Sequence, residues 1–246
     1  MTRRVWVTLG GQRNSSHQLF LFPCAGGGVG SVAPLAGELS QEFAVSALRL
    51  PGREDRFAEP PMGDLGEAVD LVAAELEPML DGRLTVMFGH SFGALLAYLT
   101  LLRLGQPDSV QILAVAGRQA PHLPVEGMRL QDLPDSALLA ALDEAGGLPT
   151  GIGRGETADL LSPIRADLAL DEQHTHDARL PAVRPLLFAL SGSRDPWAAP
   201  GAVGAWCERA ADGFTHLRCD AGHFFPSSHA TVIRRRLAAL RDGVED

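Results

Sequence analysis

Short apolar runs alternate with amphipathic stretches along this 246-residue chain, and this alternation restricts its fold more than any other feature. Strands that alternate with helices form a mostly parallel sheet covered by helices on its faces. Several of the apolar runs are nearly continuous, which is typical of central strands buried on both sides. We therefore predict an α/β fold in a single domain, residues 1–246, with strands at 18–22, 43–50, 84–88, 110–116, 186–191 and 214–219 and helices at 65–80, 93–104, 201–211 and 228–240.

Residues 121–181 interrupt this alternation, because they contain no run that resembles a strand. Helical patterns cover residues 136–145, 156–161 and 163–171 instead. A segment inserted between two sheet strands can cover an active site without disturbing the sheet. We interpret residues 121–181 as a helical lid insertion. The alternative is a helical pair that packs against the edge of the sheet.

Charge and composition exclude several classes of protein. The net charge is −9, whereas affinity for nucleic acid depends on concentrated positive charge, so we expect no nucleic-acid partner. All 21 basic residues are arginine. The absence of lysine excludes chemistry that requires one, such as a lysine Schiff base or a P-loop.

The three cysteines, Cys24, Cys207 and Cys219, form no C-x-x-C pair, so we expect neither a disulfide framework nor a metal site. We expect Cys207 and Cys219 to lie in the core.

The apolar run near the N-terminus is too short for a secretion signal, and no apolar run in the chain reaches the ~18 residues of a membrane span. We predict a cytoplasmic protein that does not contact membranes, and we expect a monomer.

A serine lies between a predicted strand and a predicted helix in the segment Gly89-His90-Ser91-Phe92-Gly93. This G-x-S-x-G pattern forms a nucleophile elbow, a turn so tight that small residues must flank the serine. The serine would then project above the sheet, and the backbone N–H of Phe92 would face a developing oxyanion. We expect His90 to brace the turn rather than to act as a base. The alternative is a serine in an ordinary strand-to-helix turn.

A serine hydroxyl becomes a good nucleophile only beside a base that a carboxylate orients. Asp195 and His223 follow the last two predicted strands, so they lie at the same edge of the sheet as Ser91. We predict that Ser91 is the nucleophile, His223 the base and Asp195 the orienting acid. Each of the last two could instead be an ordinary loop residue. Asp220 is the rival acid, but it lies too close to His223 in the chain to reach the far side of the imidazole easily.

The glycine-rich segment after the first predicted strand has two interpretations. In residues 23–28 the missing side chains would let the backbone approach a bound carbonyl, and the N–H of Ala25 would be a second oxyanion donor. Residues 28–33 also match the G-x-G-x-x-A turn of dinucleotide-binding folds, with Arg49 or Arg53 about 20 residues later, as an NADP-dependent reductase requires. Against the second interpretation, several residues separate this pattern from its strand. The chain also lacks the lysine of short-chain reductases.

Motifs along the whole domain resemble those of the type II thioesterases that accompany polyketide and non-ribosomal peptide synthases. The order Ser, Asp, His is also that of the α/β-hydrolases, to which these enzymes belong. The resemblance covers residues 18–240, and one departure from the family pattern is Cys24, where the family often has a larger residue. The matching segments are Leu21-Phe22-Pro23-Cys24-Ala25-Gly26-Gly27, Leu50-Pro51-Gly52-Arg53-Glu54-Asp55-Arg56, Phe88-Gly89-His90-Ser91-Phe92-Gly93-Ala94, Arg118-Gln119-Ala120-Pro121, Leu133-Pro134-Asp135, Ser193-Arg194-Asp195-Pro196 and Gly222-His223-Phe224-Phe225.

This resemblance implies an α/β-hydrolase fold and a serine hydrolase that removes aberrant or stalled acyl groups from the phosphopantetheine arm of carrier proteins. It implies a catalytic triad of Ser91, His223 and Asp195, with oxyanion donors from Ala25 and Phe92. No metal or redox cofactor is implied, since phosphopantetheine belongs to the substrate. The expected partners are the acyl or peptidyl carrier domains of a synthase, contacted through local arginines or apolar surface.

Other functions fit the same residues less completely. A free-standing esterase or an acyltransferase would share the fold and the triad and differ in the molecule that accepts the acyl group. A binding protein without catalytic activity could also use this scaffold. The NADP-dependent reductase described above is the most distant alternative.

Overall fold

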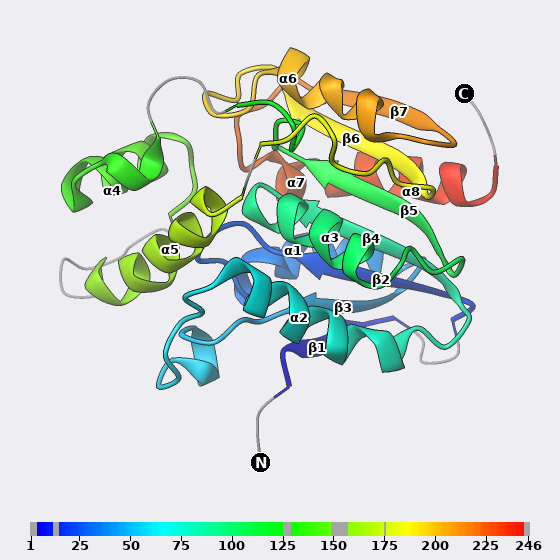
Figure 1. The fold of residues 1–246 in the computed structure, drawn as a ribbon, viewed down its shortest axis with the longest axis horizontal. Helices are drawn as coiled ribbons and strands as arrows, with labels where there is room; N and C mark the ends of the chain where they lie inside the picture. The colour runs from blue at the N-terminus through cyan, green and yellow to red at the C-terminus, as the bar shows by residue number, and fades with distance from the viewer. Residues whose placement is uncertain (1–3, 12–14, 125–128, 149–156, 175, 244–246) are drawn as a thin grey trace.

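The computed structural model describes residues 4–11, 15–124, 129–148, 157–174 and 176–243. Within these ranges, seven strands form one sheet in the order β1-β3-β2-β4-β5-β6-β7 (Figure 1). All neighbours are parallel except β1 and β3, which pair antiparallel. The predicted α/β class is therefore confirmed. The strands are β1 (Trp6–Gly10), β2 (His17–Phe22), β3 (Ala44–Leu48), β4 (Leu84–His90), β5 (Val110–Ala116), β6 (Leu186–Gly192) and β7 (Phe214–Cys219).

Helices cover both faces of the sheet and divide the core into two layers (Figure 1). Alternate residues of β2 serve the two layers: Phe20 and Phe22 pack under α2 and α3, whereas Leu19 and Leu21 pack under α1 and α8. Burial on both faces explains why the central strands are almost continuously apolar. The helices are α1 (Val29–Leu39), α2 (Leu65–Leu76), α3 (Phe92–Arg103), α4 (Asp135–Glu144), α5 (Thr157–Glu172), α6 (Pro200–Gly204), α7 (Phe225–Ser228) and α8 (Ala230–Arg241).

Strand β1 and helix α1 were not predicted from the sequence, nor was the short helix α7. Strand β1 extends the sheet beyond β3. Its five residues are too few, and too mixed in polarity, to give a strong strand pattern in the sequence. Helix α1 begins after Gly28, in the segment where the dinucleotide-binding turn was considered, and Pro34 lies inside it. Proline is a poor helix former, so the local sequence argues against a helix that tertiary packing nevertheless stabilises.

Other predicted elements differ in their bounds. The predicted helix 201–211 is α6 followed by a 3₁₀ turn, Ala205–Arg209, and 228–240 is mainly α8. Cys207 lies in that 3₁₀ turn and is exposed, so its predicted core position is wrong, whereas Cys219 is buried as predicted. Within the described ranges, no helix combines the length and apolar character needed to cross a membrane.

Helices α4 and α5 lie in the insertion, residues 121–181, between β5 and β6 and beyond the carboxyl ends of the strands (Figure 1). The separate helices predicted at 156–161 and 163–171 are one helix, α5, which continues through Pro163; residue 156 lies outside the described ranges. Arg165 joins the two helices, because its guanidinium donates to the Leu133 carbonyl and to Asp135 at the start of α4. Hydrogen bonds from α5 to the start of α4 therefore connect the two helices on the side of the sheet where the strands end.

Candidate active site

Ser91 occupies a sharp turn between β4 and α3. Its φ of 56° and ψ of −121° lie in a region that residues other than glycine rarely adopt. The backbone N–H of Ser91 donates to the carbonyl of Ala116 over 2.8 Å, which fixes the turn against the end of β5. The serine therefore has the strained conformation expected of a nucleophile elbow.

The glycines on either side of the turn leave no room for a side chain. A Cβ atom on Gly89 would lie 2.3 Å from the carbonyl oxygen of Gly93. A Cβ atom on Gly93 would lie 2.1 Å from the carbonyl oxygen of Phe22, at the end of β2. Both distances are far below van der Waals contact, so the start of α3 requires a glycine at position 89 and the end of β2 requires one at position 93.

His223 and Asp195 meet above the ends of β7 and β6, as the sequence predicts. Nδ1 of His223 lies 2.8 Å from Oδ2 of Asp195, and both side chains are buried. The other carboxylate oxygen accepts hydrogen bonds from the backbone N–H groups of Trp197, at 2.9 Å, and Ala198, at 3.1 Å. With its carboxylate held in this way, Asp195 accepts the Nδ1–H of the imidazole and leaves Nε2 free to accept a proton.

The imidazole also lies close to the elbow. A Cβ atom on Gly117 would be 3.4 Å from Cε1 of His223, and Gly117 directly follows the residue that binds the N–H of Ser91. Trp197 packs edge-on against the His223 ring, with the two centroids 4.6 Å apart. Three strand ends thus bring Ser91, His223 and Asp195 to one place, because parallel strands place their carboxyl ends at one edge of the sheet.

The two residues considered as competitors have other partners. His90 hydrogen-bonds through Nε2 to the backbone carbonyl of His223 at 2.9 Å, so it braces the turn as predicted. Burial, together with the nearby His223, lowers the pKa of His90 to about 3. Asp220 is exposed and binds Arg194 and Ser193 rather than the imidazole.

The segment that follows β2 forms a tight turn beside the start of α3. The N–H of Gly27 donates to the carbonyl of Cys24 over 2.8 Å, and Gly26 has the positive φ, 72°, that a type II turn requires. Among the hydrogen bonds of the described residues, none uses the N–H of Ala25. Phe92 is the first residue of α3, where N–H groups have no partner within the helix. Both predicted oxyanion donors are thus on backbone segments in contact with each other.

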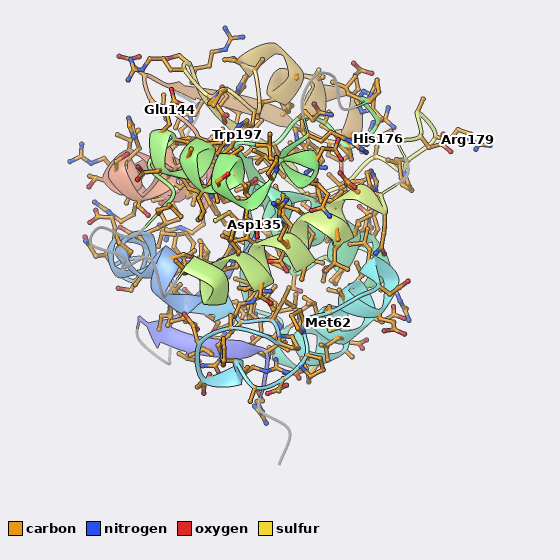
Figure 2. All side chains as sticks on the ribbon, turned by 90° about the vertical axis from the view of Figure 1, so that its left-hand side faces the viewer. Met62, Asp135, Glu144, His176, Arg179 and Trp197 are labelled. Atoms are coloured by element: carbon orange, nitrogen blue, oxygen red, sulfur yellow. The ribbon has the colours of Figure 1, made fainter. Side chains whose placement is uncertain are left out.

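The helical insertion covers this site from above. Figure 2 views the molecule from this side, with α4 and α5 in front. An apolar cluster inside the insertion extends to Trp197 and Phe224, whose rings pack against the His223 imidazole. The cluster is centred on Leu138, Leu142 and Leu161. A Cβ atom on Gly147 would lie 2.3 Å from the ring of Phe224, so the insertion lies in contact with the residue after His223.

Comparison with known proteins identifies the family. A family model described as a thioesterase domain matches residues 17–240. The chain belongs to the thioesterase family. The predicted resemblance and the predicted class of enzyme, a hydrolase of thioesters, are therefore confirmed.

Individual thioesterases resemble this chain over most of its length. A probable cadicidin biosynthesis thioesterase of Streptomyces griseus is 32% identical over 226 residues, which are 90% of this chain and 61% of that protein. The chain therefore spans less than two thirds of that relative. The structure of RedJ, a thioesterase from the prodiginine pathway of Streptomyces coelicolor, has a TM-score of 0.79 at 32% identity and covers 92% of this chain and 91% of its own.

A second solved thioesterase superposes more closely. YbtT, described as a type II thioesterase from the yersiniabactin pathway, has a TM-score of 0.84 at 25% identity and covers 95% of this chain and 96% of its own. The fold of a lipase-esterase related protein from Clostridium acetobutylicum is also similar, with a TM-score of 0.73. The predicted α/β-hydrolase fold is thus confirmed.

The thioesterase structure contradicts the dinucleotide interpretation of residues 28–33. A carboxylate oxygen of Glu54 accepts the N–H of Gly30 over 2.8 Å, so an acidic group occupies the helix N-terminus where a pyrophosphate would bind. The arginines that could have bound a 2′-phosphate are paired with carboxylates, Arg49 with Asp55 and Arg53 with Asp167.

One cluster beside the thioesterase site was not predicted. Arg53 forms a two-pronged ion pair with Asp167 of α5, with N–O distances of 2.7 and 2.8 Å, and both side chains are buried. Arg53 belongs to the Leu50-Pro51-Gly52-Arg53 segment that carries the family resemblance. That resemblance was the one sequence feature that could have pointed to a role for Arg53. Its partner lies 114 residues away, and no local pattern connects the two.

Proposed function

We propose that this thioesterase hydrolyses acyl groups from the phosphopantetheine arm of carrier proteins, and so clears aberrant or stalled acyl chains from a polyketide or non-ribosomal peptide synthase. The observation that carries the proposal is the strained Ser91 turn beside the buried His223–Asp195 pair. The biosynthetic pathways named for similar thioesterases support the substrate class.

Acylation begins with attack of Ser91 Oγ on the thioester carbonyl. His223 Nε2 takes the hydroxyl proton, while Asp195 holds Nδ1–H and stabilises the imidazolium that forms. The carbonyl oxygen becomes an oxyanion that accepts hydrogen bonds from the N–H groups of Ala25 and Phe92. Collapse of this intermediate breaks the carbon–sulfur bond, and His223 returns the proton to the leaving thiolate.

Deacylation repeats the sequence with water. His223 removes a proton from a water molecule while the water oxygen attacks the acyl-Ser91 ester. As the intermediate collapses, His223 returns the proton to Ser91 Oγ, which releases a free carboxylic acid and restores the serine hydroxyl. No metal ion or redox cofactor is required by these steps, since every proton transfer uses the same imidazole.

The insertion, residues 121–181, acts as a lid in this proposal. Its apolar cluster adjoins Trp197 and Phe224, so an acyl chain attached to Ser91 has an apolar surface to enter when the helices shift. The carrier domain docks through local arginines or apolar surface, because the thioesterase as a whole is acidic. We propose that it works as a monomer in the cytoplasm.

The test is thiol release from acyl-carrier proteins and acyl-phosphopantetheine mimics, with oxygen esters of the same acyl groups alongside. We expect carrier-bound thioesters to react fastest and Ser91→Ala to abolish turnover. Faster cleavage of oxygen esters would favour the free-standing esterase. Acyl transfer to an added alcohol or amine in place of hydrolysis would favour the acyltransferase, and unchanged turnover in Ser91→Ala would refute the proposed nucleophile.

A further inference from the structure

Helix α5 is joined to the body of the molecule by two arginine–aspartate pairs on one face. Asp167 pairs with Arg53, which follows β3, and Asp171 pairs with Arg118, which follows β5. The two aspartates are four residues apart, so they lie one helical turn from each other on the same side. The pairs are alike in chemistry and differ in what else they touch.

Only the first pair reaches the turn that carries the proposed oxyanion donor. Oδ2 of Asp167 accepts the N–H of Gly26 over 2.7 Å as well as a guanidinium N–H of Arg53. The same guanidinium nitrogen donates to the carbonyl of Gly27 over 2.9 Å. Among the described residues, the carboxylate of Asp171 accepts hydrogen bonds from Arg118 alone.

These bonds hold the middle peptide plane of the turn and the peptide plane that follows the turn. The N–H of Gly26 belongs to the peptide plane that joins it to Ala25, so the Asp167 carboxylate sets the orientation of that plane. The N–H of Ala25 belongs to the preceding plane, which joins Cys24 to Ala25, and the carbonyl of that plane accepts the N–H of Gly27. The two planes therefore meet at Ala25 within one hydrogen-bonded turn, and Asp167 acts on the Ala25 N–H through the plane next to it. Ile164 of α5 packs on the same turn, since a Cβ atom on Gly26 would lie 2.2 Å from its Cγ1. Asp167 is 1% exposed and Arg53 5% exposed. Water therefore does not compete for the hydrogen bonds of these two side chains while α5 is packed against the turn.

We propose that Asp167, held by Arg53, is a positioning residue that orients the Ala25 N–H toward the oxyanion. This inference rests on the proposed function, because it assigns a role in the same reaction. The oxyanion site is complete only while α5 rests on the turn, so the helical insertion contributes to catalysis as well as covering the site. Charge-assisted bonds to the backbone suit this role, since they are short and directional.

The matched comparison is Asp167→Asn against Asp171→Asn, two identical changes on one helix face. We expect Asp167→Asn to lower kcat for thioester hydrolysis at least tenfold with KM within twofold of native, because loss of a single oxyanion donor costs about 10²–10³ in kcat. We expect Asp171→Asn to keep kcat within about twofold. Equal losses in both variants, or a change confined to KM, would overturn the inference.

A double variant guards against simple unfolding. Asp167→Asn leaves the buried Arg53 without its full partner, which destabilises a protein strongly. Arg53→Met combined with Asp167→Leu removes both charges and the acceptor for Gly26 N–H. We expect this variant to fold, as judged by circular dichroism and Tm, and to show the same loss of kcat. A folded double variant with native kcat would also overturn the inference.

A probe that forms a tetrahedral adduct separates this inference from the proposed function. An acyl trifluoromethyl ketone adds to an activated serine and places an oxyanion in the site without thioester hydrolysis. We expect Asp167→Asn to weaken its binding at least tenfold and Asp171→Asn to leave it within twofold. Native protein that binds the ketone but releases no thiol would refute the substrate class alone. Equal binding to native and Asp167→Asn protein would refute the positioning role alone.

Discussion

The imidazole of His90 binds the backbone of His223 across 133 positions of the chain: Nε2 of the first lies 2.9 Å from the carbonyl oxygen of the second. A carbonyl only accepts, so Nε2 of His90 carries the proton. The residue before Ser91, the proposed nucleophile, is thus bonded to His223, the proposed base, which fixes the loop after β7 relative to the elbow. Because burial lowers the pKa of His90 to about 3, this bond forms from a neutral ring.

Acid should therefore destabilise the protein through His90. The unfolded state binds a proton near pH 6.5 and the folded state only near pH 3, so the stabilising effect of a neutral His90 is complete above pH 6.5 and is lost as pH falls toward 3. His90→Gln keeps a donor and removes the titration. Between pH 7 and pH 5, we expect native protein to lose about 2 kcal/mol more unfolding free energy than His90→Gln. Urea unfolding at the two pH values measures this, and equal losses would mean that His90 titrates normally when folded.

Asp195, the proposed acid of the triad, is testable against its rival Asp220. Asp195→Asn removes the charge that holds His223 Nδ1–H, and we expect kcat to fall about 10⁴-fold, as in other serine hydrolases. Asp220→Asn is the control, since that side chain is exposed and binds Arg194. We expect its kcat to stay within about twofold of native. A large loss in the control, or none in Asp195→Asn, would reverse the assignment.

The steric demand of the elbow predicts opposite effects for two glycine substitutions. Gly93→Ala places a Cβ atom 2.1 Å from a carbonyl oxygen, and we expect a loss on the order of 3 kcal/mol or more in unfolding free energy. Gly37 lies exposed in α1 with nothing near its Cβ position, so Gly37→Ala should stabilise the fold by about 0.5–1 kcal/mol. Chemical denaturation of both variants decides the matter, and a native-like Gly93→Ala would refute the tight elbow.

The cysteines should differ sharply in reactivity. Burial, with Asp167 nearby, raises the pKa of Cys24 to about 11, and burial also raises the pKa of Cys219, whereas Cys207 is exposed. Since the thiolate is the reactive form, we expect one thiol of the native protein to react promptly with a disulfide reagent at pH 8. Cys24, which is half-buried and has a raised pKa, and Cys219, which is buried, should both react much more slowly, and Cys207→Ser should remove the prompt phase. Prompt reaction of Cys24 would show that the turn is open in solution.

Much of the site was predictable because local sequence determines where a strand ends. The apolar runs before Ser91, Asp195 and His223 are each long enough to be a buried strand, and parallel strands bring their ends to one edge. The pattern around Ser91 also reflects a local steric need, since only glycines fit beside that turn. These predictions needed no knowledge of which residues meet across the chain.

Other features depended on contacts that local sequence does not record. Helix α5 runs through Pro163, at a local cost of about 3 kcal/mol, and its face carries Leu161 and Ile164 against the site. Tertiary packing offsets such a cost, whereas the sequence pattern alone predicted that the helix breaks before Pro163.

The sequence by itself determined the layered α/β fold, the edge at which the candidate site forms and the residues of the proposed triad, because each depends on periodicity and on strand ends. Only the tertiary structure decided that Arg53 pairs with Asp167 and that this pair holds the turn at Gly26. An ion pair between residues 114 positions apart follows from how α5 packs on the sheet edge. That packing depends on the shapes and charges of both surfaces together, which no single segment specifies.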